Sequence, residues 1–283
     1  MRLVLAGASG VVGRRLLPLL TAAGCSVVAL TRSRSTADVL RGPGVTPAVV
    51  DVTDRDALVD VVREAAPDVV LHQLTDLGDA DLAANAQLRR VGTRNLVDAA
   101  LAAGAKRMVA QSISWAGVAG DGPAREGDPL DVDAAEPRRT SVRGVAALEA
   151  AVGEMPEAVV LRYGLFYGPG TWYAPDGSRA DAARAGRLVA DAAVSSFVHV
   201  DDAAAAALAA LEWPAGVVNI CDDEPAAGSD WVPAFCAAVG APEPPRDDSP
   251  RPGTARGADN TRARTALGWT PRYPSWRGHL GTS

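Results

Sequence analysis

Three glycines near the start of the chain have a spacing that suits phosphate binding. They lie in AGASGVVG, which continues the apolar run RLVLAG and opens a helical stretch. The first glycine permits a tight turn, the second lets the backbone approach a pyrophosphate, and the third lets the helix pack on the strand. The helix N-terminus adds free N–H groups and a positive dipole end. The pattern predicts a dinucleotide site, with a purely structural turn as the alternative. The predicted contacts come from Gly7, Ser9, Gly10, Val11, Val12 and Gly13.

The end of the second apolar run bears on which dinucleotide binds. NAD sites usually have an acid here, which bonds the ribose 2′-hydroxyl, whereas this chain has Thr31 followed by Arg32. A guanidinium at this place favours the 2′-phosphate of NADP through charge-assisted hydrogen bonds. A solvated basic loop is the alternative reading. We therefore expect NADP as the cofactor, with NAD as the second choice.

The elements that must position these residues alternate along the chain. Continuous apolar strands that alternate with helices are typical of a parallel sheet covered on both faces. Right-handed crossovers make such a sheet doubly wound, with ligands at the carboxyl ends of its strands. We therefore expect an α/β protein with a doubly wound parallel sheet, the Rossmann fold. The expected strands lie in 2–7, 26–30, 46–52, 68–74, 106–114 and 157–164, and the helices in 11–24, 54–65, 83–103 and 141–152.

The pattern loosens after about residue 163, where segments rich in Gly and Pro predict loops. Two further strands, SFVHV and GVVNIC, lie among them, and Asp201 or Asp202 is expected to cap a helix after the first. We predict a smaller C-terminal substrate lobe that is threaded through the sheet domain. The predicted sheet domain comprises residues 1–163 plus 196–222, and the predicted lobe comprises 164–195 plus 223–283.

Composition narrows the class of protein. The net charge is -6, which disfavours nucleic-acid binding, and no apolar run approaches the roughly 20 residues of a membrane span. The three cysteines and three histidines are scattered, so neither a disulfide framework nor a metal site is expected. Because the first residues lead straight into a strand, we expect no signal peptide and a cytoplasmic protein.

Seven segments follow one another along the chain as GASGVVG (7–13), DVTD (51–54), HQLT (72–75), GTRNLVDAALAAGAKRMVAQS (92–112), LRYGLFYGPG (161–170), FVHVDDAA (197–204) and LGWTP (267–271). In this order they resemble one family, the extended short-chain dehydrogenase/reductases, which include the NAD-dependent epimerases and dehydratases. The resemblance implies that Asp51 and Val52 lie at the adenine, that Leu74 lines the cofactor, and that Ser112 is the active-site serine. The alternative role of Asp51 is to cap the helix that follows it.

The chain departs from this family at its catalytic pair, a tyrosine and a lysine four residues on, often followed by a glutamate four residues further. Glu149 fits the last position, which leaves Ser141 for the tyrosine and Val145 for the lysine. Lys106 is the only lysine of the chain, so no shift of the alignment restores the pair. Because positioned proton transfer contributes roughly 10²- to 10⁴-fold in rate, carbonyl reduction without the pair needs a substitute.

Tyr163 is the candidate substitute, because it follows a predicted sheet strand at the carboxyl end and could act with Ser112. Packing against the cofactor or the lobe junction is its alternative role. The aromatic residues crowded into 163–173 suit either a substrate wall or a hydrophobic seam. Arg251 and Arg256 are available for the phosphates of a sugar-nucleotide substrate.

Three functions remain open from the sequence. The first is an NAD(P)-dependent oxidoreductase or epimerase that acts on a small carbonyl, hydroxyl or sugar-nucleotide-type metabolite with non-standard proton-transfer residues. The second is a catalytically silent NAD(P)-binding regulator or structural protein. The third is a non-redox isomerase or lyase on the same fold. Small apolar faces on the helices of 83–103 and 141–152 lead us to expect a homodimer.

Overall fold

A computed structural model describes residues 1–75 and 81–282, and a seven-stranded parallel sheet organises its first part. The strand order is β10-β6-β5-β4-β1-β2-β3, so the chain turns one way after β1 and the other way after β3. This reversal places β1 beside both β2 and β4, which makes the β1/β4 boundary the switch point where such sheets bind ligands. The strands are β1 (Arg2–Ala6), β2 (Ser26–Thr31), β3 (Val45–Val49), β4 (Val69–His72), β5 (Arg107–Ile113), β6 (Glu157–Tyr163) and β10 (Gly216–Ile220).

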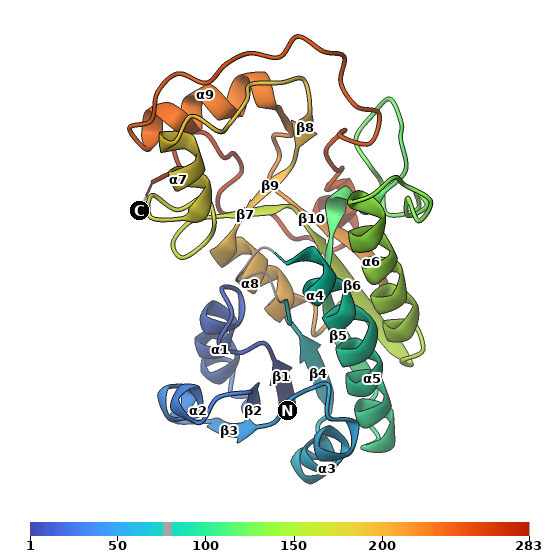
Figure 1. Ribbon diagram of the computed structural model, residues 1–283. Coiled ribbons are helices and arrows are strands. Elements are labelled where there is room, and N and C mark those ends of the chain that lie inside the picture. The colour runs from blue at the N-terminus through green and yellow to red at the C-terminus, as the bar shows by residue number, and fades with distance from the viewer. Residues whose placement is uncertain (76–80, 283) are drawn as a thin grey trace. The chain divides into compact units, whose positions relative to one another are not determined.

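Helices cover both faces of this sheet (Figure 1). One face carries α1 and α2, and the other carries the row formed by α3, α5 and α6. The expected helix of 83–103 is interrupted, because a π segment, η1, joins two α-helices there. The helices are α1 (Gly13–Ala22), α2 (Arg34–Leu40), α3 (Arg55–Ala65), α4 (Leu82–Gln87), η1 (Leu88–Gly92), α5 (Thr93–Ala102), α6 (Arg138–Val152) and α8 (Val200–Ala209).

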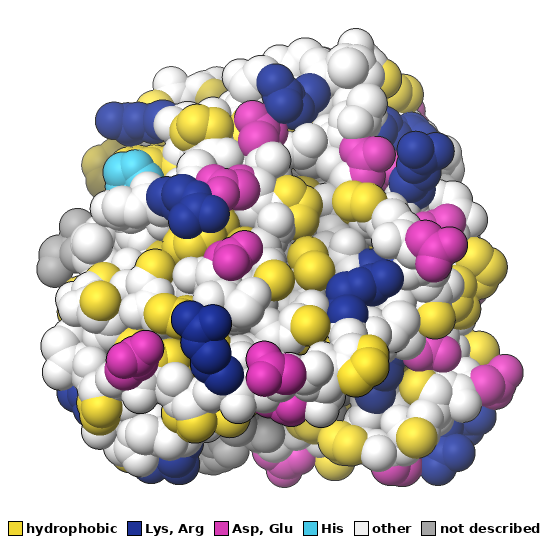
Figure 2. Space-filling model, turned by 90° about the horizontal axis from the view of Figure 1, so that it is seen from above, with side chains coloured by type: hydrophobic (Ala, Val, Ile, Leu, Met, Phe, Trp, Pro, Cys, Tyr) yellow, Lys and Arg dark blue, Asp and Glu magenta, His cyan; other side chains and the backbone are white. Residues whose placement is uncertain are grey.

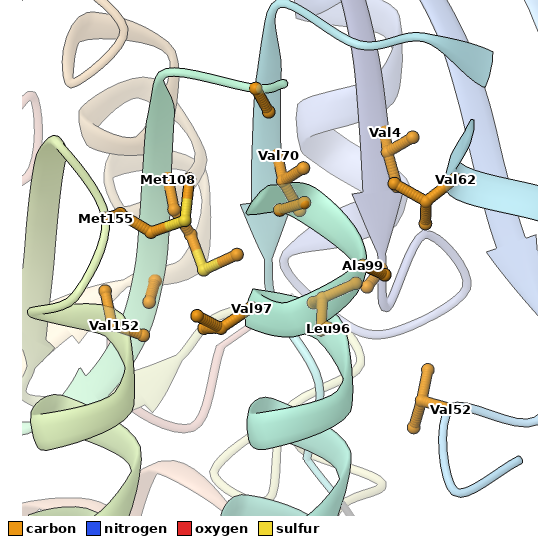
Figure 3. Packing of buried hydrophobic residues seen from close by; sticks show 14 of the residues in the cluster. Val4, Val52, Val62, Val70, Leu96, Val97, Ala99, Met108, Val152 and Met155 are labelled. Carbon is orange, nitrogen blue, oxygen red and sulfur yellow. The ribbon is translucent and has the colours of Figure 1, made fainter. Parts of the chain in front are cut away.

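A core of aliphatic side chains holds the second helix row on the sheet (Figure 3). Val4, Val70 and Met108 come from three neighbouring strands, and they meet Leu96 of α5 and Val152 of α6. Burial of such side chains contributes about 1.5–3 kcal/mol each, so this cluster fixes the helices that carry much of the candidate site.

The chain divides into two compact units, whose boundaries differ from the expected lobes. One comprises residues 1–112, 131–161 and 204–217, and the other comprises 113–130, 162–203 and 218–283. Residues 113–130, which we assigned to the sheet domain, thus belong to the second unit. Its elements outside the large sheet are η2 (Ser114–Ala116), β7 (Leu165–Tyr167), α7 (Ser178–Arg184), β8 (Val194–Ser195), β9 (Phe197–His199), β11 (Ala226–Ala227), α9 (Gly228–Ala238) and η3 (Arg262–Ala266).

The second unit has an aromatic core of its own. The ring of Tyr173 packs edge-on against Phe197 and Phe235, with centroid distances of 5.5 Å in both cases. Tyr167 is buried in the same cluster. Two rings of the crowded 163–173 segment therefore serve as core, whereas Trp172 is 39% exposed.

The expected cap of α8 is wrong. The helix begins at Val200, so Asp201 and Asp202 both lie inside its first turn. Asp202 instead accepts hydrogen bonds from the backbone N–H groups of Arg272 and Tyr273, each at 2.9 Å. A carboxylate that holds two backbone donors outside its own helix fixes a loop rather than a helix end.

On the face drawn in Figure 2, basic and acidic side chains alternate with apolar and uncharged ones. Charges of both signs are interspersed there, unlike the basic stripe of a nucleic-acid binder. Of the helices in the described ranges, none combines the length and the apolar character that crossing a bilayer requires.

Candidate active site

The glycine turn leaves no room for side chains at two of its three glycines. Gly7 has a φ of +91°, and a Cβ there would lie 2.4 Å from the carbonyl oxygen of Gln73. A Cβ on Gly13 would lie 2.1 Å from the carbonyl oxygen of Gly7. The sequence reasoning assigned these roles to both glycines, a tight turn and close helix packing, and the geometry requires glycine for each.

The start of α1 has the form of an anion cradle. Its N-cap, Val12, makes no side-chain hydrogen bond to the first turn, where the N–H groups of Arg14 and Arg15 donate to the carbonyls of Gly10 and Val12 at 3.0 Å. The N–H groups just before them, from Val11 to Gly13, are those that the helix start offers to a ligand. Ser9 and Gly10 are exposed on the turn, Val11 is half-buried, and Val12 is buried. The predicted contact residues therefore surround one helix N-terminus, as a pyrophosphate requires.

A buried glutamine completes this edge at the carboxyl end of β4. The Gln73 backbone N–H donates to the carbonyl of Ala6 at 2.8 Å, which ties it to β1. Its side chain is 4% exposed, and among the residues that the structure describes neither the amide nitrogen nor the amide oxygen has a hydrogen-bond partner. Because orphaned buried polar atoms are costly, the amide is poised for a ligand, and the residues at this edge fit a dinucleotide.

His72, the last residue of β4, has both ring nitrogens engaged. Leu74 donates its N–H to Nδ1 at 3.3 Å, so Nε2 carries the proton and donates to the hydroxyl of Thr93 at 2.8 Å. Burial lowers the pKa of His72 to about 4, and the positive charge of Arg89 contributes to the shift. His72 is therefore a neutral residue that holds the β4 end on α5.

Arg32 lies near Asp51, at the place where we expect the adenosine of the cofactor. Arg32 is exposed at the end of β2, whereas Thr31 is buried and accepts a hydrogen bond from Ser33 N at 3.2 Å. Hydrogen bonds from the N–H and the hydroxyl of Thr53, with Arg32 close by, hold the pKa of Asp51 below its usual range. Asp51 thus forms a turn, leaving the cap of α3 to Asp54.

Val52 is held in place by residues of η1 and α5. The side-chain amide of Asn95 donates to the Val52 carbonyl at 2.9 Å, and a Cβ on Gly92 would lie 3.0 Å from Cγ2 of Val52. The loop that follows β3 is therefore anchored on η1 and α5.

Ser112, near the end of β5, is completely buried and donates its hydroxyl hydrogen to Oε1 of Glu149 at 2.7 Å. Glu149 lies on α6, eight residues after Ser141 and four residues after Val145. The three side chains therefore share one stripe of the helix. Ser141 is 5% exposed and Val145 is fully buried. The stripe therefore supplies one carboxylate and no phenol or ammonium.

Tyr163 lies in the second unit, whereas Ser112 lies in the first. The Tyr163 side chain is 1% exposed, its hydroxyl donates to the carbonyl of Ala203 at 3.1 Å, and its ring lies 5.2 Å from that of Phe166. These contacts favour the packing role of Tyr163 over the catalytic one.

The two arginines considered for substrate phosphates are engaged with their own unit. Arg256 donates to Asp128 at 2.6 Å and to two backbone carbonyls, and Arg251 donates to the carbonyl of Gly120 at 3.1 Å. They fix loops, which argues against a role for them in sugar-nucleotide binding. Within residues 1–75 and 81–282, no group of His, Cys, Asp or Glu side chains is arranged to hold a metal ion.

A profile of the NAD dependent epimerase/dehydratase family matches residues 3–221. The chain belongs to this family. A 3-diazoavenalumate denitrifying reductase from a Streptomyces species is 46% identical to it over an alignment of 307 residues. The alignment covers 99% of this chain and 99% of that protein. This relationship and the fold make the protein an NAD-dependent enzyme of the oxidoreductase and epimerase type.

Solved structures show the same epimerase/dehydratase fold. WbmG of Bordetella bronchiseptica, in complex with NAD and UDP, has a TM-score of 0.77 at 22% identity, covering 96% of this chain and 90% of that one. A UDP-glucose 4-epimerase from Thermotoga maritima, with UDP-glucose, has a TM-score of 0.74 at 21% identity, covering 96% and 94%.

Sequence reasoning missed Gln73, Asn95 and Arg89. The first two stand in segments that we had matched to the family, but nothing in their types indicated an orphaned amide or a loop anchor. Arg89 stood in a long helical stretch as one of two adjacent arginines. A π segment decides which of the two points inward, and no sequence signal marked that segment.

Proposed function

We propose that this protein is an NADPH-dependent reductase that removes a diazo group from a carboxylate-bearing substrate as N₂. The observation that carries the proposal is the inner stripe of α6, where Ser141 and Val145 are buried in place of a proton-donating pair. A reaction whose acceptor needs no proton donor suits such a site. The near-full-length relative that reduces a diazo compound supports this choice.

The chemistry balances without a protein acid. A bound NADPH supplies a hydride, and a diazonium group R–N₂⁺ that accepts it on the terminal nitrogen becomes R–N=N–H. The C–N bond of this diazene then breaks, the carbon takes over the hydrogen, and R–H and N₂ are released. The net reaction converts R–N₂⁺ and NADPH into R–H, N₂ and NADP⁺. The positive charge already on the acceptor replaces the activation that a tyrosine gives to a carbonyl.

The residues of the chain hold and orient the reactants. The glycine turn and the start of α1 would hold the pyrophosphate, and the orphaned Gln73 amide would bond the cofactor beside them. The Ser112–Glu149 pair places a negative charge behind a hydroxyl oxygen at the end of β5. This arrangement would attract and orient a cationic diazonium group.

Four finer assignments belong to the same proposal. Arg32, exposed at the end of β2, supports NADP over NAD. A homodimer and a cytoplasmic location stay predictions, which sedimentation and cell fractionation test. We also keep the predicted cofactor contacts of Thr31, Asp51, Val52 and Leu74.

The test measures whether the enzyme releases the diazo nitrogen of the substrate as N₂. The purified protein is incubated with NADPH and 4-carboxybenzenediazonium that is ¹⁵N-labelled in both diazo positions. We expect NADPH oxidation at 340 nm to match the ¹⁵N₂ detected by mass spectrometry and the benzoate detected by chromatography. Reactions without protein, and with NADP⁺ in place of NADPH, measure the spontaneous loss of nitrogen.

Other outcomes separate the alternatives. Tight NADPH binding with no enzyme-dependent N₂ would refute the reductase and favour a silent regulator. Conversion of a hydroxy substrate with no net change in the cofactor would favour an epimerase, isomerase or lyase on the same fold.

A further inference from the structure

Arg89 is a buried cation in the first unit, and it lies outside the set of contacts described for the cofactor. It belongs to η1, the π segment between α4 and α5, and its side chain is only 5% exposed. Its neighbour Arg90 is exposed and bonds the side chain of Gln87. The segment therefore turns one arginine inward and the other outward.

The inward position is set by close helix packing. The segment η1 packs against α6, the helix that carries Ser141, Val145 and Glu149. One turn before Arg89, Ala86 approaches α6 so closely that a Cβ on Gly144 would lie 3.0 Å from its Cα. Arg89 also lies close enough to His72, at the carboxyl end of β4, for its charge to lower the pKa of that histidine. Arg89 thus belongs to a segment that packs on α6, and its charge acts at the carboxyl end of β4, the ligand edge of the sheet.

Among the residues that the structure describes, the guanidinium of Arg89 has no anionic partner. Across the described parts of the chain, no side chain forms an ion pair with Arg89, and no group accepts a hydrogen bond from it. Burial lowers its pKa to about 10, so it remains charged at neutral pH. Because an uncompensated buried charge is costly, a ligand that brings an anion to Arg89 would be stabilised there.

We propose that Arg89 binds the carboxylate of the substrate. The inference rests on the proposed function, whose substrate carries a carboxylate and a diazo group. A guanidinium presents a planar fork that holds a carboxylate through two hydrogen bonds, so Arg89 would anchor one end of the molecule. The Ser112–Glu149 pair would face the cationic end, and opposite charges in the site would then orient a zwitterionic substrate.

The test compares a carboxylate with its neutral amide. In turnover assays with NADPH, the paired substrates are 4-carboxybenzenediazonium and 4-carbamoylbenzenediazonium. In calorimetric titrations of the NADP⁺-loaded protein, the paired probes are benzoate and benzamide. The variants are Arg89→Met and Arg89→Lys, with Arg90→Met as the control at the exposed neighbouring arginine.

We expect Arg89→Met to weaken benzoate binding, and to raise KM for the carboxylate substrate, roughly 10- to 100-fold. Benzamide, the carbamoyl substrate and NADPH affinity should change little, Arg89→Lys should restore part of the loss, and Arg90→Met should behave as the wild type. A melting temperature near that of the wild type shows that the variants are folded.

Three results would overturn the proposal. They are equal losses for the acid and the amide, equal affinity of the wild type for benzoate and benzamide, or a loss of NADPH affinity as large as that for benzoate. The calorimetry does not depend on turnover, so it still decides the role of Arg89 if the protein reduces no diazonium compound and the proposed function fails.

Discussion

The hydroxyl of Ser112 donates a 2.7 Å hydrogen bond to the carboxylate of Glu149. The two residues come from the end of β5 and from α6, and the serine is fully buried. Because its hydrogen is committed to Glu149, the serine oxygen is left with lone pairs, and it suits an electron-poor ligand better than a carbonyl oxygen in need of a donor.

Replacing this serine tests whether the pair acts in turnover. We expect Ser112→Ala to lower kcat/KM for 4-carboxybenzenediazonium roughly 10- to 100-fold, because one charge-assisted contact in the site is lost. Glu149→Gln should reproduce the loss, and NADPH affinity should be unchanged in both. Ser26→Ala, at the exposed amino end of β2, is the control. Unaltered turnover in Ser112→Ala would remove Ser112 from the catalytic residues.

Arg32 is expected to decide the choice of cofactor. Arg32→Ala should weaken NADPH binding roughly 10- to 100-fold and leave NADH binding nearly unchanged, because only NADPH carries the 2′-phosphate. Fluorescence titration measures both affinities. Arg41→Ala, which removes an exposed arginine at the other end of α2, controls for the loss of a surface charge. Equal losses for the two cofactors would contradict the NADP assignment.

Gly13 is expected to tolerate no side chain. Gly13→Ala should cost about 1–3 kcal/mol of unfolding free energy or more, because the new methyl group would lie 2.1 Å from the Gly7 carbonyl oxygen. Urea denaturation measures this loss, and NADPH binding should fall with it. Gly42→Ala, where an added Cβ has nothing within 4 Å, should be close to neutral. Wild-type stability in Gly13→Ala would show that the turn can open.

His72 is expected to make stability depend on pH. Its pKa is about 4 in the folded protein, against 6.5 for an unperturbed histidine side chain, so the unfolded state binds the proton first. The stabilisation is present above pH 6.5 and is lost as the pH falls towards 4, by about 3 kcal/mol in all. Urea midpoints of the wild type and His72→Gln should therefore converge over this interval. A constant difference between the two would contradict the shift.

The sheet could be predicted because each strand is an apolar run of its own, as in RLVLAG and DVVLHQL, and parallel strands need no pattern beyond burial. The glycine turn could be predicted because the backbone around Gly7 and Gly13 leaves no room for a side chain. The inward turn of Arg89 could not, because it depends on a π segment inside a stretch that has ordinary helical residues. The orphaned amide of Gln73 also escaped prediction, since the residue type does not show which polar groups the fold places around a side chain.

The close approach of α4 and α6 at Gly144 has a consequence for protein engineering. A side chain at position 144 would push Ala86 away, and η1 follows α4 directly in the chain, so Arg89 would move with it. A library that aims to change substrate preference should therefore keep residue 144 invariant and vary Ser141 and Val145, whose side chains share the inner stripe. The smallest residue of α6 thus sets the dimensions within which its larger neighbours can be redesigned.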